Sequence, residues 1–218
     1  MKPPARRATV VAVALAAALA GAAGYWWFAA RDSPAVPAIS EVTAQAVPAA
    51  PTQLAETVPT FQLADRAGDL RSLQDWAGKA LIVNFWATWC APCRREIPLL
   101  QQIARERAED GFEVIGIAVD FRDKVLAYAD EMQIGYPILI GEQNALDAAA
   151  AFGVEAIGFP FTIFSDRQGR IVYAQMGELH EAEAQLILDE VAEVNRGARS
   201  PAEARVRIAA ALPALQHK

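Results

Sequence analysis

Between residues 58 and 194, the hydrophobic positions follow the period of a strand in some stretches and that of a helix in others. Residues 79–86 form a continuous apolar run, which is typical of a strand buried on both faces. The following stretch, 91–109, carries its apolar residues on one helical stripe. Strands and helices that alternate in this way predict an α/β domain with a parallel core. The same patterns predict strands at 113–119 and 136–140 and helices at 125–132, 145–152 and 184–191.

Two pairs of short strands flank turn sequences and are predicted to form antiparallel hairpins. The first pair, 61–63 and 70–73, surrounds Arg66-Ala-Gly-Asp69. The second pair, 160–164 and 170–176, lies near the end of the domain and surrounds a turn that ends at Gly169. Parallel and antiparallel pairs together predict a mixed sheet.

A further helix is predicted beyond Gly197. Ser200-Pro201-Ala-Glu203 has the pattern of a capping box with proline at the first helical position. Ile208, Leu212 and Leu215 then share one helical face. We expect a short terminal helix packed on the domain, and a partner-binding element is the alternative.

The N-terminal segment is expected to cross a membrane. Residues 8–30 form an uncharged run of 23 residues, which spans about 34 Å as a helix. Lys2, Arg6 and Arg7 precede it, so we expect the N-terminus in the cytoplasm. The aromatic residues 25–28 fall at the far interface and favour an uncleaved anchor.

A cleaved signal peptide is the alternative interpretation, because Ala18-Leu-Ala20 resembles a small-residue cleavage site. Arg6-Arg7 is only a weak twin-arginine match. In both cases the domain is exported. The predicted organisation is a cytoplasmic N-terminus (1–7), a transmembrane anchor (8–30), a Pro- and Ala-rich linker (31–57), a globular domain (58–197) and a C-terminal helical extension (198–218).

The net charge of the exported part limits the class of molecule that it can bind. The residues beyond the anchor include 17 Lys and Arg and 26 Asp and Glu, so their net charge is −9. An acidic surface of this kind argues against nucleic-acid binding. With 54% hydrophobic residues the chain can still bury one substantial core.

The chain has two cysteines, and they lie where a predicted strand gives way to a predicted helix, in Cys90-Ala-Pro-Cys93. Unpaired N–H groups and the helix dipole stabilise a thiolate at this position, and the second thiol is close enough to resolve a mixed disulfide. The pattern therefore indicates a pair that cycles between dithiol and disulfide.

Other uses of the two cysteines are less consistent with their setting. A structural disulfide would close a four-residue loop and contribute only roughly 2 kcal/mol on the loop-entropy model. A metal site needs further ligands, and the two histidines, His180 and His217, are not in motif spacing. Covalent haem attachment is excluded because Arg94 stands where a histidine is needed.

The segment from Val83 to Pro98, which contains Trp-Ala-Thr-Trp-Cys-Ala-Pro-Cys, resembles the active-site segment of thioredoxin-like proteins. The likeness runs from about residue 58 to 194 and is closest to the membrane-anchored extracytoplasmic branch of the TlpA, ResA and CcmG type. It implies a thioredoxin fold, in which a central mixed sheet is flanked by helices, with an N-terminal β-hairpin and a central insertion. It also implies that Cys90 is the exposed nucleophile and Cys93 the buried resolving thiol, with Pro92 tuning the potential.

Glu96 is the third predicted catalytic residue. It lies three residues after Cys93 on the same helical face, so its carboxylate could accept the proton of that thiol. Cytoplasmic thioredoxins instead use an aspartate on the preceding strand, where this chain has Asn84. The alternative for Glu96 is a surface glutamate that is favoured by the helix dipole alone.

A second segment, residues 154–162, resembles the part of the thioredoxin fold whose cis-proline faces the cysteines. The resemblance makes Pro160 that residue and exposes the backbone of Phe159 to an incoming client peptide. A trans proline that opens a strand is the alternative. Trp89 is expected to form a wall of the cleft, and Trp86 is expected in the core.

These expectations describe a membrane-tethered periplasmic thiol–disulfide oxidoreductase that uses no cofactor other than its own disulfide. We expect a reductant whose client is a protein disulfide, with apocytochrome c or a copper-protein assembly factor as the family's usual clients. Its electron donor is expected to be a membrane protein of the DsbD or CcdA type. A peroxiredoxin-type peroxidase and a redox-inert metallochaperone or scaffold are the alternatives.

Overall fold

The computed structural model describes residues 54–154 and 158–215. The predicted anchor at 8–30, most of the predicted linker and residues 155–157 of the segment before Pro160 lie outside these ranges. Within the described ranges, every helix is too short or too polar to cross a bilayer.

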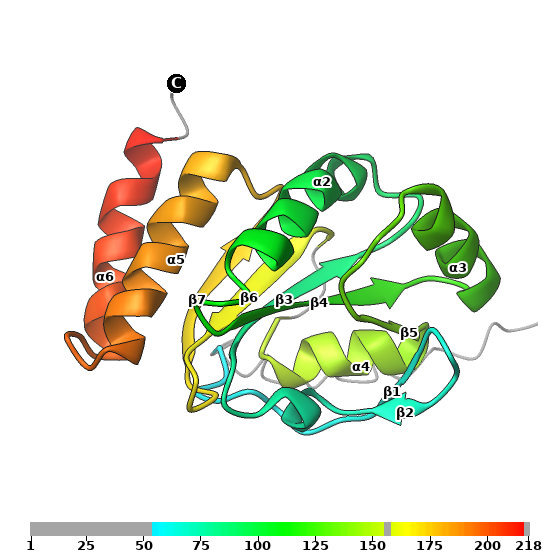
Figure 1. The fold of residues 1–218 in the computed structure, drawn as a ribbon, viewed down its shortest axis with the longest axis horizontal. Helices are drawn as coiled ribbons and strands as arrows, with labels where there is room; N and C mark the ends of the chain where they lie inside the picture. The colour runs from blue at the N-terminus through cyan, green and yellow to red at the C-terminus, as the bar shows by residue number, and fades with distance from the viewer. Residues whose placement is uncertain (1–53, 155–157, 216–218) are drawn as a thin grey trace, which may run out of the picture. The chain divides into compact units, whose positions relative to one another are not determined.

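The described residues form one mixed sheet of seven strands, in the order β2-β1-β5-β4-β3-β6-β7, with helices on both faces (Figure 1). The three central strands β3, β4 and β5 run parallel, as the alternating pattern predicted, and the outer strands pair antiparallel. The strands are β1 (Leu63–Asp65), β2 (Leu70–Arg71), β3 (Ala80–Trp86), β4 (Phe112–Val119), β5 (Ile138–Gly141), β6 (Phe161–Ser165) and β7 (Ile171–Met176).

Helices α2 and α3 cover one face of the sheet and α4 covers the other, while α5 and α6 lie side by side near β7 (Figure 1). Between β4 and β6 the chain forms α3, β5 and α4. The helices are α2 (Ala91–Glu106), α3 (Arg122–Glu131), α4 (Gln143–Ala151), α5 (Glu181–Asn195), α6 (Pro201–Ala211) and the 3-10 helices η1 (Leu73–Trp76) and η2 (Leu212–Ala214).

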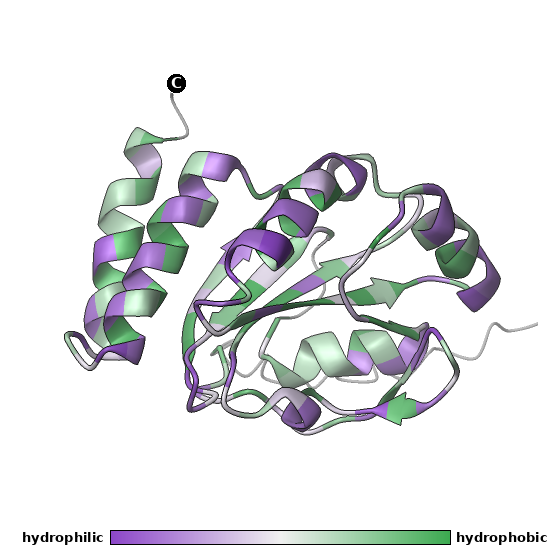
Figure 2. Ribbon diagram, viewed as in Figure 1, coloured by the Kyte–Doolittle hydropathy of each residue, from purple (hydrophilic) through white to green (hydrophobic). Residues whose placement is uncertain are grey.

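Successive residues of β3 enter two separate cores, because side chains of a strand alternate between its faces. Ile82 and Trp86 pack in the core beneath α2, α3 and α5, whereas Val83 and Phe85 pack in the core beneath α4. Figure 2 shows the same division, with apolar residues on the strands and polar residues on the outer turns of α2 and α3. The alternation directs Asn84, the polar residue of this strand, toward α2.

Most element boundaries differ from those predicted by one to a few residues, and three of the differences have a local physical cause. The second strand of the first hairpin stops at Arg71, because the chain turns into η1 and buries Leu73. β5 begins at Ile138 rather than at residue 136, since the intervening Pro137 has no N–H to donate to a strand. α2 ends at Glu106, three residues early, and the chain reverses toward β4 through Gly111, whose φ is 80°.

The folded domain begins before residue 58, where the predicted linker was expected to end. Ala55 N–H donates to Phe152 O at 2.9 Å, and Ile171 N–H donates to Glu56 O at 2.8 Å. Residue 57 forms a bridge with Arg170 beside the edge strand β7. The contacts of residues 56 and 57 arise because the edge strand β7 has unpaired backbone groups that a neighbouring segment can satisfy, whereas Ala55 binds the carbonyl group of the residue that caps the end of α4.

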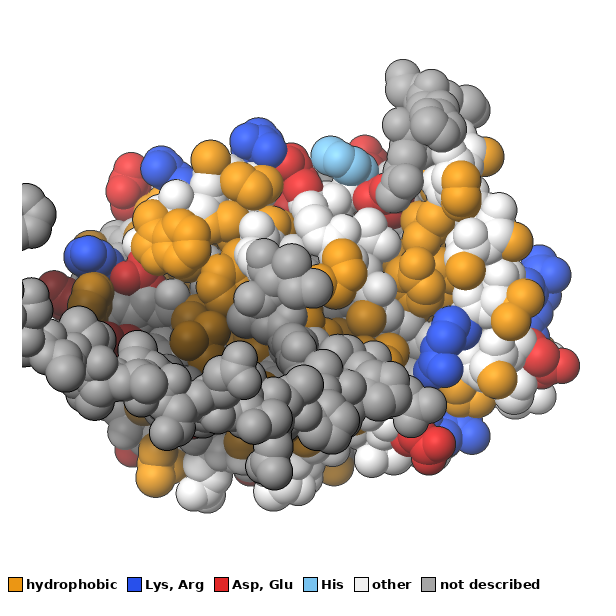
Figure 3. All heavy atoms as spheres, turned by 180° about the vertical axis from the view of Figure 1, so that it is seen from behind, with side chains coloured by type: hydrophobic (Ala, Val, Ile, Leu, Met, Phe, Trp, Pro, Cys, Tyr) orange, Lys and Arg blue, Asp and Glu red, His pale blue; other side chains and the backbone are white. Residues whose placement is uncertain are grey.

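The predicted C-terminal helix is α6, and it packs on the domain. Ser200 Oγ accepts the N–H of Glu203 at 3.2 Å, which completes the expected cap. Ile208 and Leu212 are buried against the core beneath α5. Arg205 donates to the carbonyl oxygen of Ile171 at 2.9 Å, so α6 also shields the edge of β7. The outer face of α6, at the right of Figure 3, still presents hydrophobic side chains among charged ones.

Candidate active site

Cys90 and Cys93 form a disulfide at the junction between β3 and α2. Cys90 is the N-cap residue of α2, and its Sγ accepts the N–H of Cys93 at 3.3 Å. Cys93 is completely buried, and Cys90 is 5% exposed. The expectation of an exposed Cys90 therefore needs correction for the disulfide form, because its sulfur is turned toward Cys93 and the first turn of α2.

The start of α2 favours a thiolate on Cys90 once the disulfide is reduced. The unpaired N–H groups and the positive end of the helix dipole both stabilise a negative charge there. Pro92 occupies the first turn, and the two residues after Cys93 are Arg94 and Arg95. The first turn contains no acidic side chain that would oppose the thiolate.

Glu96 is buried, with 1% of its surface exposed, so the alternative of a surface glutamate is wrong. Its Oε1 accepts a hydrogen bond from Asn84 Nδ2 at 2.7 Å, and its Oε2 accepts one from the Leu179 N–H at 2.7 Å. Asn84 comes from β3 and Leu179 from the loop before α5. The Glu96 carboxylate is therefore held between β3 and the loop before α5. It lies on the same face of α2 as Cys93.

Burial raises the pKa of Glu96 to about 7, because the ionised form loses contact with water. The two hydrogen bonds from Leu179 and Asn84 act against this increase, and the nearby charge of Glu178 adds to it. A carboxyl group with this pKa is close to half ionised at neutral pH. It can accept and return a proton at little cost, as a group that serves a thiol must.

The Phe159–Pro160 peptide bond is cis, so the alternative of a trans proline is wrong. Pro160 is buried, and its carbonyl oxygen accepts the Gly177 N–H at 2.9 Å. The ring of Phe159 lies 6.1 Å from the ring of Trp89, measured between centroids. The structure thus brings the loop that carries Cys90 together with the segment that opens β6.

Exposed aromatic side chains surround this edge of the sheet. Trp89 is 68% exposed and Phe121, which precedes α3, is 52% exposed, whereas Trp86 is completely buried. Hydrophobic side chains gather at the upper left of Figure 3, on the side of the domain that carries α3 in Figure 1. A surface of this kind fits the apolar part of another protein.

Two residues at the site carry hydrogen bonds that the motif alone did not reveal. Thr162 on β6 accepts a hydrogen bond from Asn84 Nδ2 at 3.0 Å, and Leu179 binds Glu96 through its backbone. Thr162 could have been suspected from its sequence, since it is a polar residue within a buried apolar strand. Leu179 could not, because its backbone N–H has no signature in the side-chain pattern.

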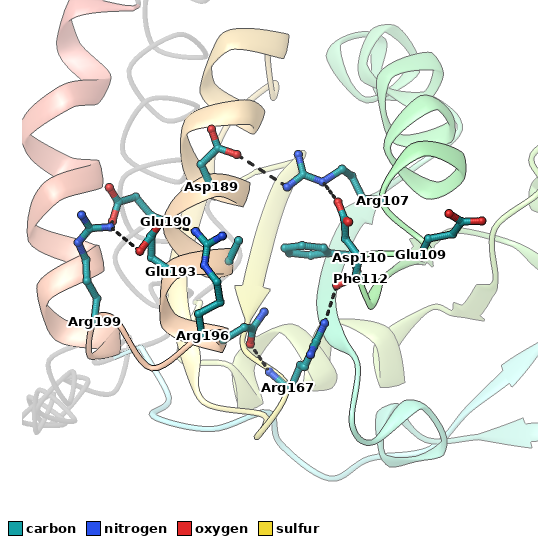
Figure 4. A pocket seen from close by; sticks show the side chains of 12 residues that line it. Arg107, Glu109, Asp110, Phe112, Arg167, Asp189, Glu190, Glu193, Arg196 and Arg199 are labelled. Atoms are coloured by element: carbon teal, nitrogen blue, oxygen red, sulfur yellow. Dashed lines mark hydrogen bonds and ion pairs between the residues drawn. The ribbon is translucent and has the colours of Figure 1, made fainter.

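A hollow of the domain lies away from the disulfide, at the other end of α2, about 24 Å along the helix. This groove of about 760 Å³ is lined by charged residues of the α2–β4 turn and of α5 (Figure 4). Arg107 pairs with Asp110 and Asp189, and Arg199 pairs with Glu190. These pairs neutralise one another and tie α5 to its neighbours, so we assign the groove a structural role.

Among residues 54–154 and 158–215, no group of three or more His, Cys, Asp or Glu side chains is arranged to hold a metal ion.

Comparison with protein families gives a match to the AhpC/TSA family over residues 54–174. This range contains both cysteines, Glu96 and Pro160.

Three individual proteins illustrate the likeness. The chain is 32% identical over 143 residues to the thioredoxin-like protein YneN of Bacillus subtilis, covering 63% of this chain and 79% of that protein. It is 32% identical over 116 residues to the thiol-disulfide oxidoreductase ResA of Geobacillus thermodenitrificans, covering 53% and 64%, respectively. The crystal structure of a thiol:disulfide interchange protein from Chlorobium tepidum superposes with a TM-score of 0.54 at 30% identity, covering 64% of this chain and 94% of that one.

Proposed function

Since the chain belongs to the AhpC/TSA family and is a thiol–disulfide oxidoreductase of the ResA type, we propose that it reduces protein disulfides outside the cytoplasm while tethered to the inner membrane. The observation that carries this proposal is the disulfide at the start of α2 with a buried carboxyl group on the same helix face.

In the proposed reaction, the Cys90 thiolate of the reduced protein attacks one sulfur of the client disulfide. A mixed disulfide forms, and the other client sulfur leaves as a thiol after taking up a proton. Cys93 then passes its proton to the carboxylate of Glu96, and the resulting thiolate attacks the sulfur of Cys90. The client leaves with both cysteines reduced, and the protein is left with the Cys90–Cys93 disulfide.

The client is proposed to bind as an extended segment beside Phe159, where backbone groups next to Pro160 can pair with it in the manner of an added strand. The exposed ring of Trp89 would cover the client residues that flank its cysteine. Apocytochrome c or a copper-protein assembly factor is the proposed client, and a membrane protein of the DsbD or CcdA type is the proposed donor that reduces the disulfide again. The resemblance of the motif segment to the membrane-anchored branch supports both.

The first prediction concerns the direction of electron flow. A reductant needs a low reduction potential, so we expect the full-length protein to equilibrate nearer to about −270 mV than to about −120 mV. The measurement is the fraction of disulfide at equilibrium with glutathione and with a dithiol buffer of lower potential. A value near the upper figure would identify an oxidant and contradict the proposal.

The same sample distinguishes the other two candidate functions. A peroxiredoxin-type cysteine normally follows a Thr-x-x-Cys pattern, whereas the third residue before Cys90 is Ala87. The neighbouring Thr88 is occupied by hydrogen bonds to Asp120. Turnover of peroxide by the reduced protein would favour a peroxidase, and tight copper or zinc binding with insulin left intact would favour a metallochaperone.

The second prediction concerns the tether. We expect the full-length chain, expressed with its N-terminus intact, to sediment with the membrane fraction and to resist extraction by high salt and alkaline carbonate. A protease added outside the inner membrane should digest the domain. Recovery of a shortened, soluble periplasmic form would instead identify residues 8–30 as a cleaved signal peptide.

A further inference from the structure

Asn84 lies in the middle of the central strand β3 and is completely buried. Its Nδ2 donates to Glu96 Oε1 at 2.7 Å and to Thr162 Oγ1 at 3.0 Å. Within the described residues, its Oδ1 has no hydrogen-bond partner. A buried amide that directs both of its donors at two side chains, while its oxygen makes no bond to the protein, takes its orientation from those two side chains.

Both partners can donate as well as accept. A hydroxyl such as that of Thr162 does either, and the carboxyl of Glu96 accepts when ionised and donates when protonated. We propose that Asn84 is a positioning residue that keeps Glu96 hydrogen-bonded in both protonation states by turning its side-chain amide through 180°. The inference rests on the proposed function only in that Glu96 changes its protonation during the reaction.

The number of hydrogen bonds is the same in the two states. With Glu96 ionised, the two hydrogens on Asn84 Nδ2 are donated to Glu96 Oε1 and to Thr162 Oγ1. When Glu96 takes up a proton on Oε1, the turned amide presents Oδ1, which accepts that hydrogen and the Thr162 hydroxyl hydrogen. Oε2 accepts the Leu179 N–H in both states. No proton is gained or lost by Asn84 or Thr162, so Glu96 alone carries the charge.

Other charged or titratable groups around Glu96 modify its titration but cannot replace this role. Glu178 lies in the loop before α5, and its Oε2 accepts a hydrogen bond from Arg95 Nε at 2.9 Å. This bond lowers the pKa of Glu178 and keeps its carboxyl group ionised. Tyr136, which precedes β5, is buried, and both burial and the charge of Glu96 raise its pKa. Cys93 lies on α2 itself, three residues before Glu96 and on the same face of the helix. Asn84 is the side chain that donates directly to the carboxylate.

The test measures the titration of Glu96 in the oxidised full-length protein, by ¹³C NMR of its side-chain carboxyl carbon. Asn84→Leu removes the hydrogen-bond partner of Glu96 in both of its protonation states. The ionised form of Glu96 loses more stabilisation than the protonated form, because hydrogen bonds to charged groups are stronger. We expect the midpoint to rise by about one pH unit. Asn84→Asp places two carboxyl groups in contact, so we expect two apparent midpoints, the upper one above that of the wild type. Thr162→Val is the matched control and should move the midpoint by less than about half a unit.

A second readout reports the amide itself. In the wild type, the two side-chain N–H signals of Asn84 should shift with the same midpoint as the Glu96 carbon. The inference is overturned if these signals do not respond, or if a folded Asn84→Leu variant keeps the wild-type midpoint. If Asn84→Leu does not fold, the inference is also overturned by a single titration midpoint in Asn84→Asp that equals the wild-type midpoint. If Glu96 proves dispensable for thiol exchange, the proposed proton transfer fails while these titrations still decide the role of Asn84.

Discussion

Replacing Cys93 by serine is expected to leave the protein covalently attached to its client through Cys90. Attack on the client disulfide needs only the Cys90 thiolate, which the start of α2 still stabilises. Release needs a second thiolate, and serine cannot supply one at neutral pH. The adduct should therefore accumulate until nearly all reduced protein is consumed, and a non-reducing gel would show it as a band that disappears on treatment with a reductant.

The matched variant is Cys90→Ser, which keeps Cys93 but should form almost no adduct, because Cys93 is completely buried in the disulfide form. The comparison assigns the two roles separately. Equal adduct yields from the two variants, or a higher yield from Cys90→Ser, would show that the nucleophile has been assigned to the wrong cysteine. Mass spectrometry of the trapped band would also identify the client, for which the fold provides no specific signature.

Much of this fold could be predicted because its central strands are buried on both faces. β3 is apolar except for Asn84, so its place between two layers of helices follows from the sequence. The strand boundaries were harder to predict where a local turn competes with the sheet. Leu73 has the right hydrophobicity for a continued strand, yet it is buried from η1, because tertiary packing outweighs a two-residue alternation.

The site was predictable to the extent that its residues lie on one segment. Cys90, Cys93 and Glu96 are within seven consecutive positions, so helix geometry relates them directly. The groups that hold Glu96 come from positions more than ten residues away in either direction, and one of them is a backbone N–H. The bond from Asn84 to Thr162 depends in addition on the register of β6 against β3, in which Thr162 lies opposite Asn84, and sequence periodicity does not fix that register.

Replacing Glu96 by glutamine is expected to slow the release of the client far more than its capture. The amide cannot take the proton of Cys93, and loss of a general base typically reduces a rate by about 10²-fold or more. Capture by Cys90 should change little, because the first turn of α2 is intact. Stopped-flow measurement of mixed-disulfide formation and decay separates the two steps. Glu109→Gln, in the exposed turn that follows α2, is the matched control and should leave both rates unchanged.

The rate of release should depend on pH in a way that only the wild type shows. Release in the wild type should increase as Glu96 ionises, with an apparent midpoint that reflects its pKa of about 7. In Glu96→Gln, this dependence should disappear, leaving only the titration of Cys93. If both proteins give the same pH profile, Glu96 is not the proton acceptor.

The same variant should change the pH dependence of stability. Burial raises the pKa of Glu96 from 4.5 to about 7, so the folded protein binds more protons than the unfolded chain within that window. The free energy of unfolding should therefore decrease as pH rises from 4.5 to 7, by about 3 kcal/mol from this group. A glutamine mimics the protonated acid, since its oxygen can accept from Leu179 while its amide donates to a turned Asn84, and it does not titrate. Urea unfolding of the oxidised proteins between pH 4 and 8 should show a slope in the wild type that Glu96→Gln lacks. Parallel curves would mean that the carboxyl group is not held in the desolvated setting on which its proposed role depends.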